Sequence, residues 1–473
     1  MSSSIVWFRR NLRLTDNAAL EAAIEDGHPL LMVYVLDELD AGAASRWWLH
    51  GSLASLAAGI ERLGGRLILR RGDPVDILDE LADRHAAASI HCARRYEAEA
   101  AEQERRLAAR LGARAVLQLH EDSLLRRPVD VTTQTGSNYK VFTPYYKASI
   151  AQGQPAEPGP APEELPAMVP DAATELLQDW RLLPAKPDWA AGFREVWTPG
   201  ERGAEERIGE IADNIGAYGK GRDHPAEEAT SRLSPHLHFG EISPRQVWHG
   251  VMSHAREHRR EEAAEPFTRQ LHWRDFSAYL LFHNPTLPEQ PLRPEFRDFP
   301  WHDDAEALEA WQKGQTGYPI VDAGMRQLWH TGWMHNRVRM IVASLLVKHL
   351  LIPWQRGAEW FMDTLVDADA ANNSAGWQWV AGCGSDAAPY FRIFNPITQG
   401  QKFDPQGEYV RQWVPELREL PARFVHEPWT ADDFTLQTSA ISLGETYPRP
   451  IIEHKAGREQ ALAAYRSMRE RRG

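Results

Sequence analysis

Two arginines and two aspartates set among tryptophans are the residues of this sequence that best suit chemistry. Arg337 and Arg339 follow Trp333, and Asp367 and Asp369 come later in the same tryptophan-rich stretch. An arginine in apolar surroundings needs an anionic partner. The aspartates could provide it, or could bind Mg²⁺. We favour the ion pair, because no glycine-rich phosphate loop accompanies the aspartates.

Tryptophan is concentrated in one part of the chain: nine of the 18 tryptophans lie between Gln270 and Val380. Packing in a helical core explains most aromatic side chains of this kind. It explains Trp377 and Trp379 less well, because residues two apart on a helix do not share a face. Such side chains could instead stack on bases or on a flavin ring, or relay electrons.

A second polar cluster follows Tyr218, in the segments Lys220–Asp223 and Thr230–Ser234. Small hydroxyl side chains at a helix start can bind an anion together with free backbone N–H groups. A Thr-Ser-x-x-Ser run is, however, more often a helix cap with a turn. Both interpretations stay open. None of the 19 histidines forms H-E-x-x-H and no Ser-His-Asp arrangement is evident, so hydrolysis is poorly supported.

The elements that must position these residues differ between the two ends of the chain. Five short apolar runs predict strands at Ile5–Phe8, Leu30–Leu36, Arg66–Leu69, Ser89–Cys92 and Ala115–Leu119. Apolar spacing predicts a helix over Ser45–Leu63, and Asp73-Pro74 predicts the start of another. This βα alternation predicts an α/β domain with a doubly wound, Rossmann-like parallel sheet and helices on both faces. No G-x-G-x-x-G motif follows the first run.

The rest of the chain predicts a helical domain. Residues 151–200 hold nine of the 32 prolines and read as a surface linker. From about Glu201 onward the patterns are helical, and Pro448–Gly473 predicts a short tail helix. We therefore expect an α/β domain of the antenna type over 1–130, an interdomain linker over 131–200 and a large all-α domain over 201–473.

Composition limits the protein class. The 473 residues carry a net charge of −13, which does not exclude nucleic acid because the local field matters more than the total. Two cysteines far apart argue against a disulfide framework or a cysteine metal site. The start has no apolar signal core, and the best apolar run, Ile341–Ile352, is interrupted by Lys348 and His349. We expect a cytoplasmic protein without a membrane span or a metal.

Several motifs, in order over almost the whole chain, resemble the DNA photolyase/cryptochrome family, and most of all its class I cyclobutane pyrimidine dimer photolyases. The matching segments are Val6–Leu14 with Asp16-Asn17, Tyr139–Pro144, Thr230–Ser234, Trp273–Phe276, Gly317–Asp322, Gly332–Arg339, Asp367–Trp379 and Tyr390–Pro396. The resemblance implies an FAD-binding helical domain and a carbon–carbon lyase. Its reaction would be light-driven repair of cyclobutane dimers in UV-damaged DNA, by electron transfer from excited FADH⁻ to a flipped-out dimer.

The resemblance also assigns the FAD site by position. Hydroxyl and neighbouring side chains would hold the phosphates and ribitol, a second set would surround the ring system, Asn373 would face flavin N5 and Arg339 would pair with Asp367. The implied cofactor residues are Tyr218, Thr230, Ser231, Arg232, Leu233, Ser234, Phe267, Gln270, Arg274, Trp333, Arg339, Asp367, Ala368, Asp369 and Asn373.

The family's relay and lesion pocket are assigned in the same way. Trp377, Trp354 and Trp301 match the three tryptophans that carry electrons to an oxidised flavin. Trp273 and Trp379 would be the aromatic walls of the pocket. The other residues around the lesion would be Gln270, Asn336, Arg337 and Met340. The residues that face the DNA backbone would be Arg222 and Gln399.

Two departures from the family pattern matter. Gln270 stands where cyclobutane-dimer enzymes have a glutamate, and its amide can still donate to a pyrimidine carbonyl. Tyr96-Glu97 lacks the Asn-Glu that follows in folate-binding members, so a deazaflavin or FMN antenna is favoured over folate, and Ser45–Leu49 resembles the segment that lines such a pocket. A chain with no antenna is the open alternative.

Two rival functions remain within the family. A cryptochrome-like photosensor is disfavoured by the intact pocket residues and by a tail that ends soon after Pro450. A (6-4) photolyase needs a histidine where this chain has Asn336. We expect a monomer whose partner is damaged DNA, with no protein partner evident.

Overall fold

A parallel sheet forms the centre of the N-terminal part of the chain. The computed structural model describes residues 2–37, 42–170, 172–386 and 391–471. Its strands are β1 (Ser3–Phe8), β2 (Leu30–Leu36), β3 (Leu67–Arg71), β4 (Ala87–Ala93) and β5 (Val116–His120). They pair in the order β3-β2-β1-β4-β5, and every neighbouring pair is parallel. Each of the five predicted runs overlaps one of these strands, so this prediction is confirmed.

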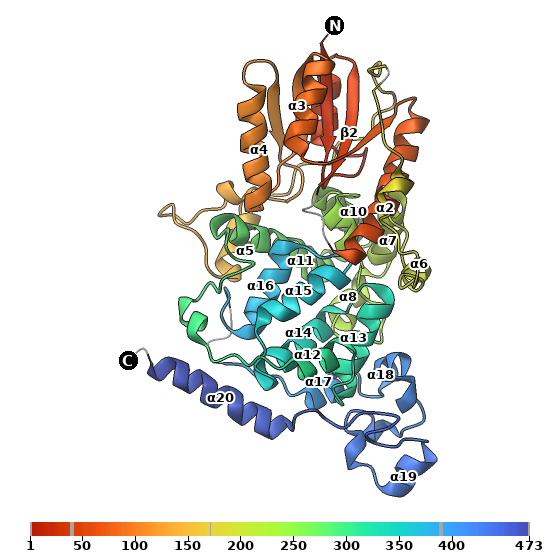
Figure 1. Cartoon of the computed structure of the whole chain (residues 1–473), viewed down its shortest axis with the longest axis vertical. Coiled ribbons are helices and arrows are strands. Elements are labelled where there is room, and N and C mark those ends of the chain that lie inside the picture. Colours follow the sequence, from red (N-terminus) through yellow and green to blue (C-terminus); the bar gives the residue numbers. More distant parts are fainter. Residues whose placement is uncertain (1, 38–41, 171, 387–390, 472–473) are drawn as a thin grey trace. The chain divides into compact units, whose positions relative to one another are not determined.

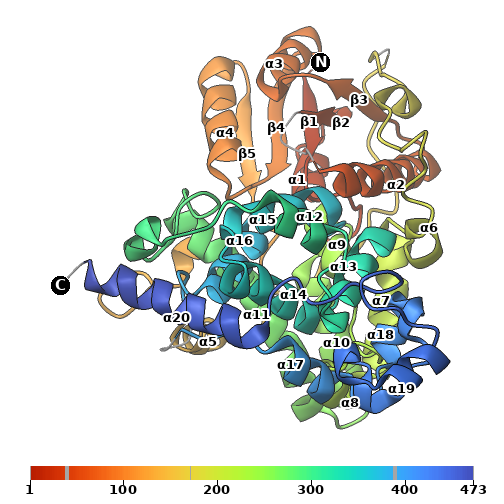
Figure 2. The ribbon, with the colours of Figure 1, turned by 60° about the horizontal axis from the view of Figure 1, so that its bottom comes forward.

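Helices cover both faces of the sheet, which explains why its central strands β1 and β2 are buried along their whole length. Ile5 and Trp7 share one core with α3 (Pro74–Arg84) and α4 (Ala98–Leu111), whereas α1 (Ala18–Glu25) and α2 (Ala43–Arg62) also contact the strands (Figures 1 and 2). A sheet buried on both faces is the expected result of parallel βα units.

The predicted cap of α3 is confirmed. The Asp73 side chain accepts a hydrogen bond from the backbone N–H of Val75 at 2.7 Å, and Pro74 occupies the first helical position. Aspartate at this place satisfies a backbone donor that the helix leaves free, and proline has no donor to lose there. The predicted helix over Ser45–Leu63 corresponds to α2.

The proline-rich segment runs against the sheet. Backbone hydrogen bonds join Leu30 to Ala167 and Val169, and the Thr174 hydroxyl accepts from the N–H of Leu69 at 2.8 Å. Two short helices interrupt the segment, η2 (Leu177–Trp180) and α6 (Phe193–Val196), and two others precede it, η1 (Pro128–Asp130) and α5 (Phe142–Ile150). The predicted domain boundaries near 130 and 200 stay a prediction.

Beyond residue 200 the described residues form helices joined by loops, as predicted. The α-helices are α7 (Glu201–Asp213), α8 (Ile215–Gly221), α9 (Ser234–Phe239), α10 (Pro244–Glu257), α11 (Glu261–His283), α12 (Ala305–Gln312), α13 (Pro319–Thr331), α14 (Asn336–Ser344), α15 (Trp354–Thr364), α16 (Ala370–Ala381), α17 (Pro396–Phe403), α18 (Glu408–Trp413), α19 (Asp433–Thr438) and α20 (His454–Glu470). Shorter turns are η3 (Pro294–Asp298), η5 (Pro415–Leu417), η6 (Ala422–Phe424) and η7 (Pro428–Thr430), and η4 (Leu345–His349) is a π-helix. The predicted tail helix is α20, and its expected end at Gly473 lies outside the described residues.

The chain folds as two compact units. The first contains Met1–Gly219, Ser231–Pro285 and Val366–Ala368, and the second contains Lys220–Thr230, Thr286–Leu365 and Asp369–Gly473. Both units therefore include helices from the C-terminal half of the chain. In the described part of the chain, no helix is both long enough and apolar enough to cross a membrane.

Candidate active site

In the first unit, the hydroxyl cluster is joined to the Asp367 segment. The Ser234 hydroxyl donates to the Asp367 carboxylate at 2.7 Å, and the Ser231 hydroxyl accepts from the N–H of Leu233 at 3.4 Å. Helix α9 starts at Ser234, and its N-cap residue, Leu233, makes no side-chain cap hydrogen bond. The simple helix-cap interpretation of Thr230–Ser234 is therefore wrong, and the hydroxyls serve other contacts.

An aromatic and apolar cluster lies behind these hydroxyls. The rings of Tyr218 and Phe267 meet edge to face at 5.3 Å, and both pack with buried Leu233. Arg274 donates to the carbonyl oxygens of Ser123 at 2.5 Å and Leu237 at 3.2 Å. Because Leu237 belongs to α9, Arg274 fixes this helix against α11, and a direct contact of Arg274 with a cofactor stays a prediction.

The predicted lesion wall Trp273 has one face covered by the protein itself. Its ring stacks on Phe142 with centroids 3.6 Å apart and planes 10° apart. One turn earlier on α11, the Gln270 amide donates to the carbonyl of Pro266 at 3.2 Å, which leaves its oxygen and second N–H for other partners. Phe142 was not among the predicted site residues, although it lies within the family segment Tyr139–Pro144.

Two residues beyond Trp273, a buried carboxyl has an unusual pKa. Burial raises the pKa of Asp275 to about 7, against partial compensation from Arg274 and from the backbone N–H of Arg126. One carboxyl oxygen of Asp275 and the hydroxyl of Tyr145 are buried without a hydrogen-bond partner among the described residues. The neutral carboxyl is therefore the better fit to this environment.

In the second unit, the first turn of α14 carries two of the predicted lesion residues. Asn336 is exposed at the first helical position. Arg337 pairs with Asp223 at 2.9 Å, and its guanidinium lies 4.4 Å from the centroid of the Phe403 ring. The expected partners of the arginines were Asp367 and Asp369, and for Arg337 this prediction is wrong. Sequence reasoning missed Asp223 because the pair joins segments far apart in the chain.

His335 fixes the start of this helix and was also missed. Its Nδ1 accepts from the N–H of Arg337 at 3.2 Å, which makes His335 the N-cap of α14. Burial lowers the pKa of His335 to about 4, so the ring is neutral at physiological pH. A neutral ring that accepts at Nδ1 carries its proton on Nε2.

The start of α16 orients Asn373. Asp369 caps the helix by accepting from the N–H of Asn372 at 2.8 Å. The Asn373 amide donates to the carbonyl of Ala358 on α15 at 3.0 Å. Only the amide nitrogen can donate to a carbonyl, so the Asn373 oxygen is left as an acceptor, which is the orientation that a contact with flavin N5–H needs.

The three predicted relay tryptophans differ in exposure. Trp377 and Trp354 are buried, and Trp301 is partly exposed beside Phe299, with ring centroids 4.4 Å apart. Trp377 packs against Gly357 so closely that a Cβ at this glycine would lie 2.1 Å from its ring. The order from buried to exposed agrees with a path to the surface, and the electron path itself stays a prediction.

Trp377 and Trp379 use different faces of α16, as predicted. Trp379 is partly exposed and donates from Nε1 to the carbonyl of Asp386 at 3.1 Å. Gln378 between them is fully buried and donates to the carbonyls of Leu287 and Gln290. Of the remaining predicted residues, Gln399 lies partly exposed on α17, and Tyr390 of the last family segment lies outside the described residues.

The predicted flavin residues divide between the two units. The first unit holds Tyr218, Ser231, Arg232, Leu233, Ser234, Phe267, Gln270, Arg274, Asp367 and Ala368, and the second holds Thr230, Trp333, Arg339, Asp369 and Asn373. Within the second unit, Arg339 donates to the carbonyl of Met334 at 2.8 Å. Its predicted pairing with Asp367 stays a prediction.

The sequence indicated no metal site, and it indicated a candidate antenna site at Ser45–Leu49. The described residues contain no cluster of three or more histidine, cysteine or acidic side chains placed to hold a metal ion. In the expected antenna segment, Trp47 and Trp48 are buried. Rings of the chain itself cover them, because Trp47 meets Phe193 at 5.3 Å and Trp48 meets Trp197 at 5.3 Å.

Two family models match the chain: DNA photolyase over residues 4–166 and FAD binding domain of DNA photolyase over residues 267–467. A deoxyribodipyrimidine photo-lyase of Agrobacterium fabrum is 47% identical, over 98% of this chain and 98% of that protein. The chain belongs to the DNA photolyase/cryptochrome family. The match over residues 267–467 also gives this family member an FAD-binding domain.

Other relatives of this photolyase family chain refine the comparison. Cryptochrome-1 of Arabidopsis thaliana is 36% identical, over 97% of this chain and 70% of that protein. A crystal structure of a bacterial class III photolyase from Agrobacterium tumefaciens superposes with a TM-score of 0.97 at 46% identity, over 99% of this chain and 98% of that one. The predicted family, fold class and photolyase type of enzyme are confirmed. The narrower class I expectation is not, since this neighbour is a class III enzyme.

Proposed function

We propose that the protein splits cyclobutane pyrimidine dimers in UV-damaged DNA with the energy of light. The observation that carries this proposal is the first turn of α14. There Asn336 is exposed, and Arg337 is held by Asp223 and Phe403. A (6-4) photolyase needs a histidine at the position of Asn336. The relative that is 47% identical is a deoxyribodipyrimidine photo-lyase, which supports the same substrate.

Asn373 fits FAD through the amide oxygen that its contact with the protein leaves available. Asn373 presents an amide oxygen because its nitrogen already donates to Ala358. We propose that Tyr218, Thr230, Ser231, Arg232, Leu233, Ser234, Phe267, Gln270, Arg274, Trp333, Arg339, Asp367, Ala368, Asp369 and Asn373 hold the cofactor. When bound, FAD supplies the light-excited electron that splits the dimer. Asn373 then accepts a hydrogen bond at N5 without adding charge, and Trp377, Trp354 and Trp301 conduct electrons from the surface.

In the proposed complex the damaged bases are rotated out of the DNA helix. Extrusion of the target base is a general property of photolyases, because chemistry on a base is blocked inside the duplex. Trp273 and Trp379 replace lost stacking, which is worth about 1–3 kcal/mol per base. Gln270, Asn336 and Met340 contact the dimer.

Two arginines and one glutamine complete the proposed contacts with DNA. Arg337 contacts the lesion with its guanidinium already fixed in direction by Asp223. Arg222 and Gln399 contact the DNA backbone. Charged donors suit phosphate oxygens, because hydrogen bonds between ionised partners are about twice as strong as neutral ones.

One experiment tests the function. The purified protein, with its flavin chemically reduced, is illuminated with an oligonucleotide that carries one thymine dimer, and the thymine absorbance that returns on splitting is measured. We expect splitting in the light, none in the dark, and none with a (6-4) photoproduct in the same sequence. Splitting of only the (6-4) photoproduct would reject the proposal.

A blue-light photosensor is the second candidate, because cryptochrome-1 of Arabidopsis thaliana matches nearly the whole chain. The same experiment separates the two functions, since a photosensor changes its flavin spectrum in light but leaves the dimer intact. An absorption spectrum of the purified protein also tests a second chromophore. We propose a deazaflavin or FMN for that role, and bands of FAD alone would reject it.

A further inference from the structure

The C-terminal helix is basic in an acidic protein. Residues 448–473 contain seven arginines and lysines against three glutamates, whereas the whole chain has a net charge of −13. Helix α20 occupies most of this segment. This positive segment can attract anions locally, although the net charge of the whole protein is negative.

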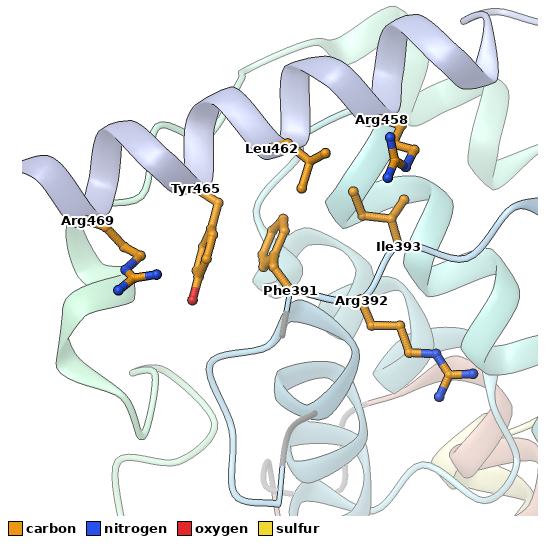
Figure 3. Close-up of a pocket in the computed structure, with 7 residues that line it drawn as sticks. All are labelled: Phe391, Arg392, Ile393, Arg458, Leu462, Tyr465 and Arg469. Atoms are coloured by element: carbon orange, nitrogen blue, oxygen red, sulfur yellow. The ribbon is translucent and has the colours of Figure 1, made fainter. Parts of the chain in front are cut away.

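A pocket of about 550 Å³ lies against this helix (Figure 3). Arg458, Tyr465 and Arg469 reach it from α20, and Phe391 and Arg392 reach it from the connection that follows α16. None of its lining residues is acidic. Within the described part of the chain, Arg392, Arg458 and Arg469 form no ion pair, whereas nearby Arg293 pairs with Glu295 at 2.8 Å. The pocket is therefore lined by three arginines that form no ion pair with described residues, although Glu295 lies near Arg469 in the adjoining pocket.

The rings in the pocket have no free face for a base. Phe391 stacks on Tyr465 with centroids 4.5 Å apart and planes 9° apart. The Lys348 ammonium nitrogen lies 3.0 Å from the centroid of Phe391, on the face that Tyr465 leaves open. Figure 3 shows Arg469 on the side of Tyr465 that faces away from Phe391. Charge, and not stacking, is thus what this pocket offers to a ligand.

The pocket is linked by direct contacts to the helix that carries the lesion wall Trp379. Lys348 donates to the carbonyl of Ala381 at 2.7 Å, two residues beyond Trp379 at the end of α16. The same lysine contacts Phe391, and Phe391 contacts Tyr465 of α20. A chain of contacts through the buried Lys348 and through Phe391 therefore joins α16, which carries Trp379, to α20 within the second unit.

We propose that this pocket binds backbone phosphates of the DNA that flanks the lesion. The inference rests on the proposed function, since it assumes DNA bound at Trp379. Duplex DNA carries one negative charge about every 1.7 Å along its axis, so a duplex that reaches Trp379 extends phosphates well beyond the damaged step. Exposed arginines that make no base contact give affinity and orientation without sequence preference.

The test measures binding of the full-length protein to a dimer-containing duplex of about 30 base pairs over a range of salt concentrations. The variant Arg458→Gln with Arg469→Gln removes two pocket charges. We expect its slope of log affinity against log salt to be smaller by about 0.9 per arginine, with at least about tenfold weaker binding at low salt. Both side chains are exposed, so folding should be unaffected.

A matched control separates contact from general attraction. The variant Arg466→Gln with Arg471→Gln removes the same charge from exposed positions on α20 and its end that do not line the pocket. We expect its slope to stay near that of the parent. An equal change in both variants, or no change in either, would overturn the proposal.

A short substrate separates this proposal from the proposed function. A thymine-dimer dinucleotide has one internal phosphate and no flanking duplex, so the Arg458→Gln, Arg469→Gln variant should split it as fast as the parent does. Slower splitting of the dinucleotide would place these arginines in the reaction and overturn the proposal. Failure of the parent to split any dimer would reject the proposed function alone, because the salt dependence of binding is measured separately.

Discussion

Trp273 lies flat against Phe142, with ring centroids 3.6 Å apart. Such a stack holds the indole plane in one orientation while its other face is not involved in the pair. Phe142 is buried and stands on α5, so the wall of the proposed lesion pocket is fixed by a helix far away in sequence. We infer that Phe142 is a positioning residue that acts through Trp273.

The first prediction follows from this stack. Phe142→Leu should weaken binding of dimer-containing DNA by about 2- to 10-fold, because an aromatic pair is worth about 0.5–1.5 kcal/mol beyond its buried area. The rate of splitting at saturating DNA should not change. Phe276→Leu is the control, since Phe276 meets Trp273 at its edge, at 5.9 Å and 73°, and leaves the stack in place. Equal loss of affinity in both variants would indicate general loosening of the core.

The second prediction concerns the amide of Asn373. Asn373→Asp removes the donor to Ala358 and places a charge where a neutral acceptor stood. We expect a destabilisation of about 1–3 kcal/mol and altered flavin spectra during stepwise photoreduction. Urea unfolding and absorption spectra measure the two effects. Unchanged spectra in Asn373→Asp would remove the residue from the flavin site.

The third prediction tests the relay. Trp301→Phe should block photoreduction of the oxidised flavin, because phenylalanine is far harder to oxidise than tryptophan, and should leave dimer splitting unchanged once the flavin is reduced chemically. Trp329→Phe is the control, since Trp329 is an exposed tryptophan of the same unit that stacks on Trp360. Loss of photoreduction in Trp329→Phe instead would move the exit of the relay to that pair.

Local patterns in the sequence were sufficient for most of the fold. Each predicted apolar run overlaps a strand, and Asp73-Pro74 marks the start of α3, because capping depends only on neighbouring residues. Contacts between distant segments were not accessible in this way. Asp223 stands opposite Arg337, and Phe142 behind Trp273, only because tertiary packing brings them together.

The hydroxyl cluster shows the same limit within a short segment. Thr230–Ser234 has the composition of a helix cap, yet Ser234 donates to Asp367, a residue that lies far along the chain. A side chain that can cap a helix can equally well satisfy another group nearby, and composition does not decide between them. The orientation of the Asn373 amide was inaccessible for the same reason, since it depends on the carbonyl of Ala358 on another helix.

The fourth prediction concerns Gln270, which stands where related enzymes have a glutamate. A carboxyl donates to a pyrimidine carbonyl only when it is protonated, whereas an amide donates at any pH. Gln270→Glu should therefore remain active and acquire a pH dependence, with the yield per absorbed photon, measured from about pH 6 to about pH 9, falling as the carboxyl ionises. The parent should give a flat profile. Two identical flat profiles would mean that residue 270 does not touch the lesion.

The last prediction uses the raised pKa of Asp275. Burial moves this pKa from 3.8 to about 7, so the native state binds a proton that the unfolded chain has already released in this interval. The contribution of Asp275 to stability should therefore fall as the pH rises from about 4 to about 7, by at most about 4 kcal/mol, and then level off. Asp275→Asn, which is neutral at every pH, should match the parent near pH 4 and exceed it above pH 7. Urea unfolding across this range measures the difference. Asp122→Asn is a comparison variant: burial raises the pKa of Asp122 as well, but this substitution removes the partner of buried Arg13 at 3.0 Å and should therefore destabilise the protein at neutral pH. A difference in stability between Asp275→Asn and the parent that stays constant from about pH 4 to pH 7 would show that the Asp275 carboxylate is stabilised after all, by its backbone donors and by Arg274.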